Sequence, residues 1–161
     1  MAPTQTTTLQ RCATRYFGAA EYDEHSVLVF PEGIPAFEHE RRFVAIRQPM
    51  NEPLVFLQSL STPELCFVTL PVQAVAPRFE LSMTPEDLEL LELETARQPA
   101  IGREVLCLVI VSLEENAPPT VNLLAPLVVN LGTLHGCQAI QSGSCYSLRE
   151  PLPLREAAPC S

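Results

Sequence analysis

The chain has 161 residues, of which 47% are apolar, and its ten arginines and absent lysines stand against nineteen acidic residues for a net charge of −9. This length supports one domain with a substantial core, and the apolar fraction is too high for a disordered chain. The negative charge would repel a phosphate backbone and attract a basic protein partner, although it also serves solubility. We therefore expect no direct nucleic-acid binding.

The sequence also lacks the signals of a membrane or secreted protein. No apolar run approaches the ~20 residues of a transmembrane helix. The start, MAPTQTTTLQR, has no apolar segment typical of a secretory signal. The cysteines are irregularly spaced, without a CxxC pair, at Cys12, Cys66, Cys107, Cys137, Cys145 and Cys160. We expect a cytoplasmic protein with reduced thiols and no membrane contact.

The sequence of the first half of the chain predicts short strands separated by turns. Residues 1–10 are polar and are expected to form a flexible end, and SVLVF then predicts a strand. In FPEGIPAF, residues 30–37, two prolines and Gly33 predict a turn anchored by Phe30, Ile34 and Phe37. RFVAIRQ, LVFLQSL and ELCFVTL follow, each bounded by turn-forming residues as strands are. A further short strand is expected over 78–83.

The second half contains the one convincing helix signal. Thr84 is a good N-cap, Pro85 suits the first helical position, and Asp87 stands where the acid of a capping box belongs. We expect this helix to continue to Gln98-Pro99. EVLCLVIVSL then predicts a strand buried on both faces. TVNLLAPLVVNL, CQAIQ and CYSLRE predict the remaining strands, and residues 153–161 a flexible end.

These elements predict the fold class. Eight to ten short strands, sixteen prolines and no alternating helices argue against a parallel α/β sheet. We expect a single domain over residues 1–161 that is mainly β. Its architecture would be a compact antiparallel β-barrel or closed sandwich of short strands, with one or two short helices.

The segment NLLAPLVVN raises a question because a proline interrupts an apolar run that asparagines bracket. Pro126 cannot donate to a sheet ladder, so it predicts a corner between two short strands, TVNLL and LVVN. Corners leave backbone groups unpaired, and an amide side chain offers both a donor and an acceptor to satisfy them. We therefore interpret Asn122 and Asn130 as structural residues.

This segment, followed by GCQAIQ and YSLREPL, resembles the C-terminal signature of the FliW family of flagellar assembly factors. FPEGIPAFEHERRFV is similar to the family's F-x-x-G-[IL]-P-G-F-E stretch, and LVFLQSL to its F-x-x-L-Q-S strand. The resemblance spans about 120 residues in the family's order. Two positions depart from it: Leu124 replaces a usual Gln, and Ala36 replaces a second glycine, which implies ordinary negative φ or a mild rearrangement there.

The resemblance implies a cytoplasmic binding protein that is not an enzyme and needs no cofactor. FliW proteins bind flagellin and also bind CsrA, an RNA-binding repressor, preventing its repression of flagellin messenger RNA. Flagellin that accumulates occupies FliW and releases CsrA. The resemblance also implies structural roles for the motif residues Gly33, Pro35, Asn122, Pro126 and Asn130.

Candidate partner-binding residues come from charge, apolar character and motif position. The densest acidic stretch suits a basic partner, though a solvated helix face has the same composition, and it contains Glu86, Asp87, Glu89, Glu92 and Glu94. Ile34 and Phe37 would serve a groove for amphipathic flagellin helices if they are exposed rather than in the core. Gln138, Tyr146 and Arg149 match family motif positions, where Arg149 is expected to pair with a carboxylate and Tyr146 to cover an open barrel end.

Other functions were weighed from the same residues. His135, Cys137 and Cys145 suggest a metal or catalytic pair, but a hairpin around Gly143 would separate the two thiols by ~13 Å. That distance is too long for a disulfide or a shared zinc ion. His25 and His39 lie among acids without metal-binding spacing, and phosphate-binding and nucleophile motifs are absent. The alternatives left open are a small-ligand-binding barrel and an adaptor for another secretion system.

Overall fold

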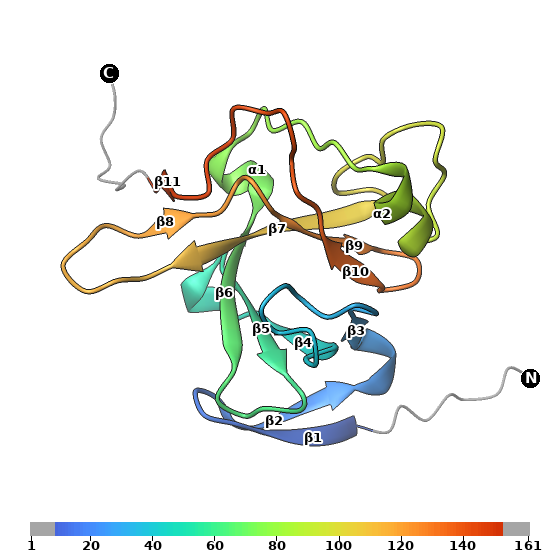
Figure 1. The fold of residues 1–161 in the computed structure, drawn as a ribbon. Helices are drawn as coiled ribbons and strands as arrows, with labels where there is room; N and C mark the ends of the chain where they lie inside the picture. Colours follow the sequence, from blue (N-terminus) through green and yellow to red (C-terminus); the bar gives the residue numbers. More distant parts are fainter. Residues whose placement is uncertain (1–8, 153–161) are drawn as a thin grey trace, which may run out of the picture.

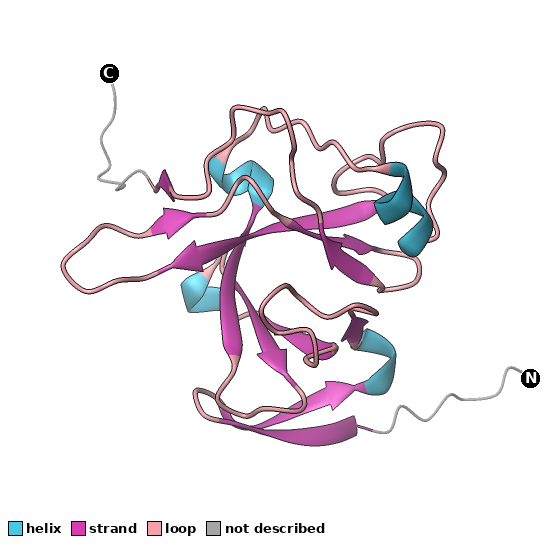
Figure 2. Ribbon diagram, in the orientation of Figure 1, coloured by secondary structure: helices cyan, strands magenta, loops and turns pink. Residues whose placement is uncertain are grey.

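The computed structural model describes residues 9–152. Figure 1 labels its elements and Figure 2 shows that strands and loops dominate. The strands are β1 (Leu9–Thr14), β2 (Gly18–Asp23), β3 (Leu28–Val29), β4 (Arg42–Ile46), β5 (Val55–Ser59), β6 (Cys66–Pro71), β7 (Val105–Ser112), β8 (Thr120–Val121), β9 (Leu127–Asn130), β10 (Gly136–Gln138) and β11 (Glu150–Pro151). The helices are α1 (Val72–Val75) and α2 (Pro85–Leu90), with 3-10 turns η1 (Glu24–Ser26) and η2 (Pro49–Asn51).

The strands form one large antiparallel sheet and a separate ribbon. The large sheet runs β10-β9-β7-β6-β5-β4-β3, with β8 pairing both β7 and β11, while β1 and β2 pair only with each other. The prediction of a mainly β, antiparallel fold with one or two short helices is confirmed, with two helices present. The sheet is sandwich-like and does not close into a barrel; its ends meet at an isolated bridge between Val29 and His135.

Strand β7 organises the sheet because its two halves pair with different strands. Its first half pairs with β9 and its second half with β8. Between β8 and β9 the chain leaves the ladder around Pro126, where Asn122 Oδ1 accepts a hydrogen bond of 2.9 Å from Ala125 N. The predicted corner between two short strands is therefore present.

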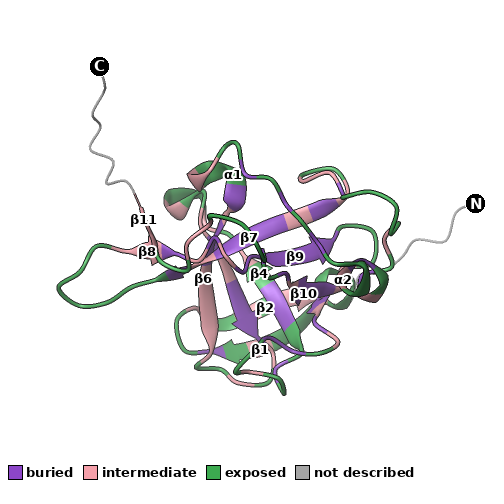
Figure 3. Cartoon of the chain, turned by 45° about the horizontal axis from the view of Figure 1, so that its top comes forward, coloured by how far each residue is buried: buried purple, intermediate pink, exposed green. Residues whose placement is uncertain are grey.

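Two apolar clusters fill the fold. One lies under α1, α2 and the segment between them and includes Leu88, Leu91, Val105 and Val128. The other lies under residues 30–37 and includes Phe30, Phe43, Leu57 and Leu127, with the Phe30 and Phe43 rings 5.6 Å apart edge to face. Figure 3 shows the buried β7 and β9 between covering segments. Each fully buried Phe or Leu contributes about 1.5–3 kcal/mol, which makes this packing the main stabilising term.

The predicted strand over 78–83 is wrong, although the segment is extended and alternates buried and exposed residues. Phe79, Leu81 and Met83 are buried, so the side-chain pattern is that of a strand. Side chains rather than a neighbouring strand satisfy its backbone: Ser82 N donates to Gln141 Oε1 at 2.8 Å, and Met83 N to Gln98 Oε1 at 2.7 Å. The alternation therefore reports burial and not a hydrogen-bonded ladder.

Other sequence-based expectations are corrected at the two ends of the described chain. Leu9 and Gln10 belong to β1 and not to a flexible end, and the β1–β2 hairpin was not predicted. Residues 139–149 contain no strand, so the expected hairpin around Gly143 does not form. The other expected flexible residues, 1–8 and 153–161, lie outside the described residues. In the part that the structure describes, no helix is long and apolar enough to cross a membrane.

Candidate functional site

Three predicted motifs converge on one surface hollow of about 180 Å³. The turn over 30–37, helix α2 and strand β10 each supply part of its wall. Its lining residues are Glu32, Gly33, Pro35, Glu38, Asp87, Leu90, Gly136, Cys137 and Gln138. We call this the acidic hollow, because its only ionised lining groups are the three carboxylates and its remaining walls are mostly apolar.

The turn over residues 30–37, which lines the hollow, has backbone conformations that few residue types adopt. Gly33 has φ +71°, and a Cβ there would lie 2.3 Å from the Glu38 carbonyl oxygen. Gly33 N donates to Phe30 O at 2.8 Å, which closes the first part of the turn. Ala36 has φ +77°, so the expectation of negative φ at this departure from the family pattern is wrong. The backbone at Ala36 therefore adopts the left-handed conformation, which is strained for a residue that has a Cβ atom.

Helix α2 begins as predicted and ends early. Thr84 Oγ1 accepts a 3.1 Å hydrogen bond from Asp87 N, which confirms the N-cap. The helix stops at Leu90, and Glu92 has φ +58°, so the predicted continuation to Gln98 is wrong. Asn130 Nδ2 donates to Leu91 O at 2.7 Å and so ties the end of the helix to β9. Glu92 and Glu94 consequently lie beyond the helix.

Strand β10 forms the floor of the hollow and fits closely against the turn. A Cβ on Gly136 would lie 2.7 Å from the Phe30 ring, which is fully buried. Gln138 Nε2 donates to Ala125 O at 2.9 Å and so holds β10 to the Pro126 corner. Burial, together with the nearby charges of Asp87 and Glu32, raises the pKa of Cys137 to about 12. That thiol is therefore protonated at neutral pH.

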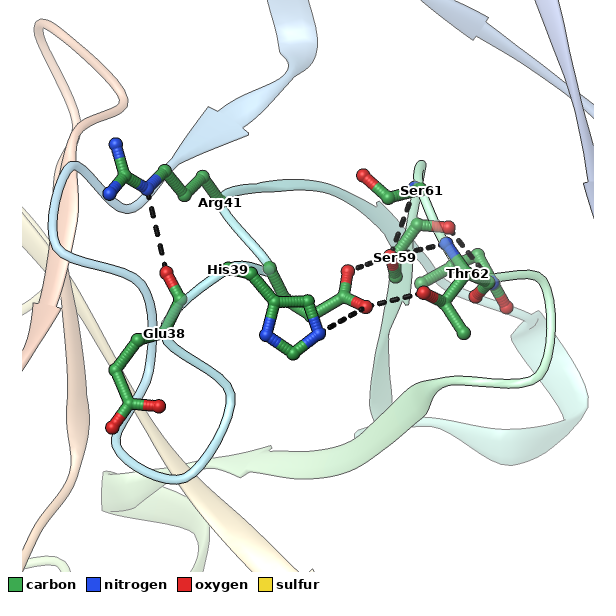
Figure 4. Close-up of polar contacts among 8 residues, drawn as sticks. Glu38, His39, Arg41, Ser59, Ser61 and Thr62 are labelled. Atoms are coloured by element: carbon green, nitrogen blue, oxygen red, sulfur yellow. Dashed lines mark hydrogen bonds and ion pairs between the residues drawn. The ribbon is translucent and has the colours of Figure 1, made fainter.

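The carboxylates differ in how far they are neutralised. Glu94 bonds Arg97 at 2.7 Å, and Glu92 lies 3.6 Å from His135. Within residues 9–152, by contrast, no ion pair engages Glu32, Glu38, Glu86, Asp87 or Glu89. Arg41 Nε donates to the backbone carbonyl of Glu38 at 3.5 Å, and Figure 4 shows the Glu38 carboxylate turned away from it. Five carboxylates without an ion pair thus lie on the hollow or on α2, while others, such as Glu52 and Glu64, are dispersed elsewhere on the described chain.

The apolar candidates in the turn are not exposed as a groove requires. Ile34 is 2% exposed, so its side chain belongs to the core and is closed to a partner. Phe37 is half-buried and packs edge to face on Phe67 at 5.3 Å between ring centres. The interpretation of Ile34 as part of a partner groove is therefore wrong, and its anchoring role is the one the packing supports.

Two other candidates lie away from the acidic hollow. Tyr146 stacks on Phe79 with 4.4 Å between ring centres, and its hydroxyl accepts from Glu80 N at 2.9 Å. Tyr146 therefore holds the extended segment 78–83 and does not cover an open barrel end, as had been expected. Arg149 Nη1 lies 3.4 Å from Glu114 Oε1, both exposed, so it pairs with a carboxylate on the β7–β8 loop. The predicted partner-binding residues therefore do not form one surface.

The sequence did not reveal a buried polar cluster that holds the β5–β6 loop. Glu40 is 2% exposed; its carboxylate accepts a 2.7 Å hydrogen bond from Ser59 Oγ and another from Thr62 Oγ1. Figure 4 shows Ser59 and Thr62 turned toward this carboxylate, with His39 beside it. Burial opposes ionisation, but the bonds from Thr62 and Ser59 outweigh it and lower the pKa of Glu40. One acid before an apolar strand gives no sequence signal for this arrangement.

The arrangement of the described residues does not support the metal or catalytic interpretation of His135, Cys137 and Cys145. Cys137 is buried, whereas Cys145 is exposed. Among the described residues, no three His, Cys, Asp or Glu side chains are grouped as a metal ion would require.

Comparison with known proteins identifies the chain's relatives. The family model described as FliW protein matches residues 11–152. The chain belongs to the FliW family. A flagellar assembly factor FliW from Syntrophomonas wolfei is 35% identical over 136 residues, covering 84% of this chain and 83% of that protein. One from Bacillus licheniformis is 31% identical over 140 residues, covering 86% and 94%.

A solved structure supports the same conclusion. The crystal structure of the flagellar assembly factor FliW superposes with a TM-score of 0.78 at 29% identity and covers 91% of this chain and 99% of that one. The family resemblance indicated by the sequence motifs is confirmed. FliW proteins act in flagellum biogenesis, so this chain is assigned to flagellar assembly.

Proposed function

We propose that this chain is a cytoplasmic, non-enzymatic partner of CsrA and of flagellin. It would hold CsrA away from flagellin messenger RNA until flagellin displaces it. Membership of the FliW family supports the proposal, together with one structural observation: the uncompensated carboxylates of the acidic hollow and α2. The flagellar names of the compared relatives favour this reading over an adaptor for another secretion system.

The acidic hollow suits a partner that presents arginine or lysine side chains. Glu32, Glu38 and Asp87 surround walls formed partly by Pro35 and Leu90, and apolar walls accept the aliphatic stem of a basic side chain. An RNA-binding repressor carries basic surface, which the chain's charge of −9 would attract over long range. Such charge pairs act mainly on the association rate and on partner choice.

The test reverses one charge in the hollow and one on the neighbouring helix α2, and compares this with an equal reversal elsewhere. In Glu32→Lys/Glu89→Lys, two attractions of about 0.2–1 kcal/mol each become repulsions of similar size. We expect CsrA to bind roughly 4- to 800-fold more weakly, with a shallower salt dependence. The matched control is Glu52→Lys/Glu64→Lys, which changes two exposed acids on loops outside the hollow.

Each result decides a different part of the proposal. A selective loss in the hollow variant, measured by isothermal titration calorimetry, supports the assigned surface. An equal loss in both variants shows that only net charge matters and removes the hollow from the interface. Failure of the unmodified chain to bind either CsrA or flagellin refutes the proposed function itself.

A further inference from the structure

In the ribbon of β1 and β2, strand β1 forms a free outer edge six residues long. β1 keeps one continuous register from Leu9 to Thr14 opposite β2, without a bulge, a proline or a glycine. Figures 1 and 3 both place β1 on the outer side of the ribbon and β2 on the side of the body. At ~3.3 Å per residue, this edge offers about 20 Å of unpaired backbone.

The ribbon's other edge strand, β2, is equally long but lies on the side of the body, and the edges of the large sheet are short or blocked. The large sheet ends in β10, of three residues, and β3, of two residues. β11 has two residues, one of them Pro151, which has no N–H to donate. Natural proteins protect sheet edges in these ways because an open edge adds strands from other chains. β1 has neither of these protections, so its backbone is open to an added strand.

Charge and exposed apolar groups favour a second copy of this chain as the added strand. The ribbon, residues 9–23, is neutral (2 − 2 = 0) in a chain of net charge −9, its charged residues being Arg11, Arg15, Glu21 and Asp23. It is therefore a surface at which two such chains can meet with little repulsion. Leu9, at the start of β1, and Tyr16, in the turn between β1 and β2, are 55% and 61% exposed. A contact along β1 would cover both.

We propose that two copies associate by antiparallel pairing of their β1 strands, with Cys12 opposite its own copy. In this register Arg11 faces Ala13 of the second copy, and Gln10 faces Thr14. Shifting the two-fold axis to Arg11 would place two guanidinium groups directly opposite, which is destabilising. Pairing two six-residue strands covers less than the ~1,200 Å² of a standard interface, so we expect weak association, on the order of 100 µM.

The register can be tested by charge at an exposed site on the edge. Ala13 is exposed, and the two-fold axis places it opposite Arg11 twice in the dimer. We expect Ala13→Glu to tighten association and Ala13→Arg to weaken it, each roughly 2- to 30-fold. Net charge alone predicts the opposite order, because Ala13→Glu makes each chain more negative. The matched controls are Ala19→Glu and Ala19→Arg, on β2 directly opposite Ala13 and one strand from the edge.

Sedimentation equilibrium from about 10 µM to about 1 mM measures the association, and raising salt should strengthen it by screening the repulsion between chains. A mass that stays at one chain over this range, or variants that follow net charge, would overturn the proposal. Oxidised glutathione supplies a second test, since it takes two electrons from two thiols and leaves one disulfide. In a Cys145→Ser/Cys160→Ser background, opposed Cys12 residues fall within disulfide range and should give a covalent dimer that Cys12→Ser abolishes. Absence of that dimer contradicts the register.

Discussion

Asn130→Ala should destabilise the protein far more than its neighbour's replacement, Asn122→Ala. Asn130 is 8% exposed and joins three parts of the fold. Its Nδ2 donates to Leu91 O at 2.7 Å, and its Oδ1 accepts from Gly132 N at 2.8 Å. Asn122 is half-buried and makes one local bond, to Ala125 N.

The magnitude follows from which groups lose their partners. Alanine at 130 leaves the Leu91 carbonyl without a donor in a buried place, which costs about 1–3 kcal/mol, and removes the Gly132 bond at about 0.5–1.5 kcal/mol. We expect a loss of about 2–4 kcal/mol in the free energy of unfolding, or roughly 4–16 °C in Tm for a domain of this size. Asn122→Ala should cost about 0.5–1.5 kcal/mol.

Urea unfolding followed by circular dichroism measures both variants, and Asn130→Asp adds a pH test. Burial and the Leu91 carbonyl disfavour a carboxylate there, which raises the pKa of the aspartate in the folded state. A raised folded pKa means that the stability of this variant is greatest in acid and falls as the pH rises through that pKa. Equal losses for Asn130→Ala and Asn122→Ala, or an Asn130→Asp variant that gains relative stability with rising pH, would refute the reasoning.

Three further predictions concern strand β10, the buried carboxylate and the helix cap. Gly136→Ala should cost about 1–3 kcal/mol and lower Tm, because its Cβ would lie 2.7 Å from the buried Phe30 ring; an unchanged Tm contradicts this. Glu40→Gln should lose about 1–2 kcal/mol at pH 7, since its two hydroxyl donors then bond a neutral group. The Glu40 pKa is lowered from its ordinary value of 4.5, so the wild-type advantage is present above that pH and disappears as the pH falls through the folded pKa; an advantage that persists in strong acid opposes the assignment. Thr84→Ala should cost about 1 kcal/mol in urea unfolding through loss of the bond from Asp87 N, and no loss would show that the cap is dispensable.

The sequence predicted those elements in which local chemistry and tertiary structure agree. β7 is apolar along its length and is buried on both faces, and the Pro126 corner follows from a missing N–H. Thr84 and Pro85 start α2 in the structure as their local preferences indicate. These features depend on residues that are adjacent in sequence.

The failures arise where distant groups decide the structure. α2 ends at Leu90 although glutamate and leucine continue, because Glu92 turns into left-handed geometry and Asn130 bonds Leu91 O. β1 and β2 show no alternation of apolar and polar residues, since the ribbon is mostly exposed on both faces. The acidic hollow joins three segments that are more than 100 residues apart at their extremes, from Glu32 to Gln138. Composition revealed its charge, and only the fold revealed its shape.

Competition between the two proposed partners tests the central claim most directly. Fluorescently labelled CsrA is bound to the chain at physiological salt, and monomeric flagellin is added while anisotropy is recorded. The account predicts that anisotropy rises when CsrA meets the chain and returns to the free value as flagellin saturates it. CsrA that never binds, or a complex that flagellin leaves intact while itself failing to bind, would contradict the account.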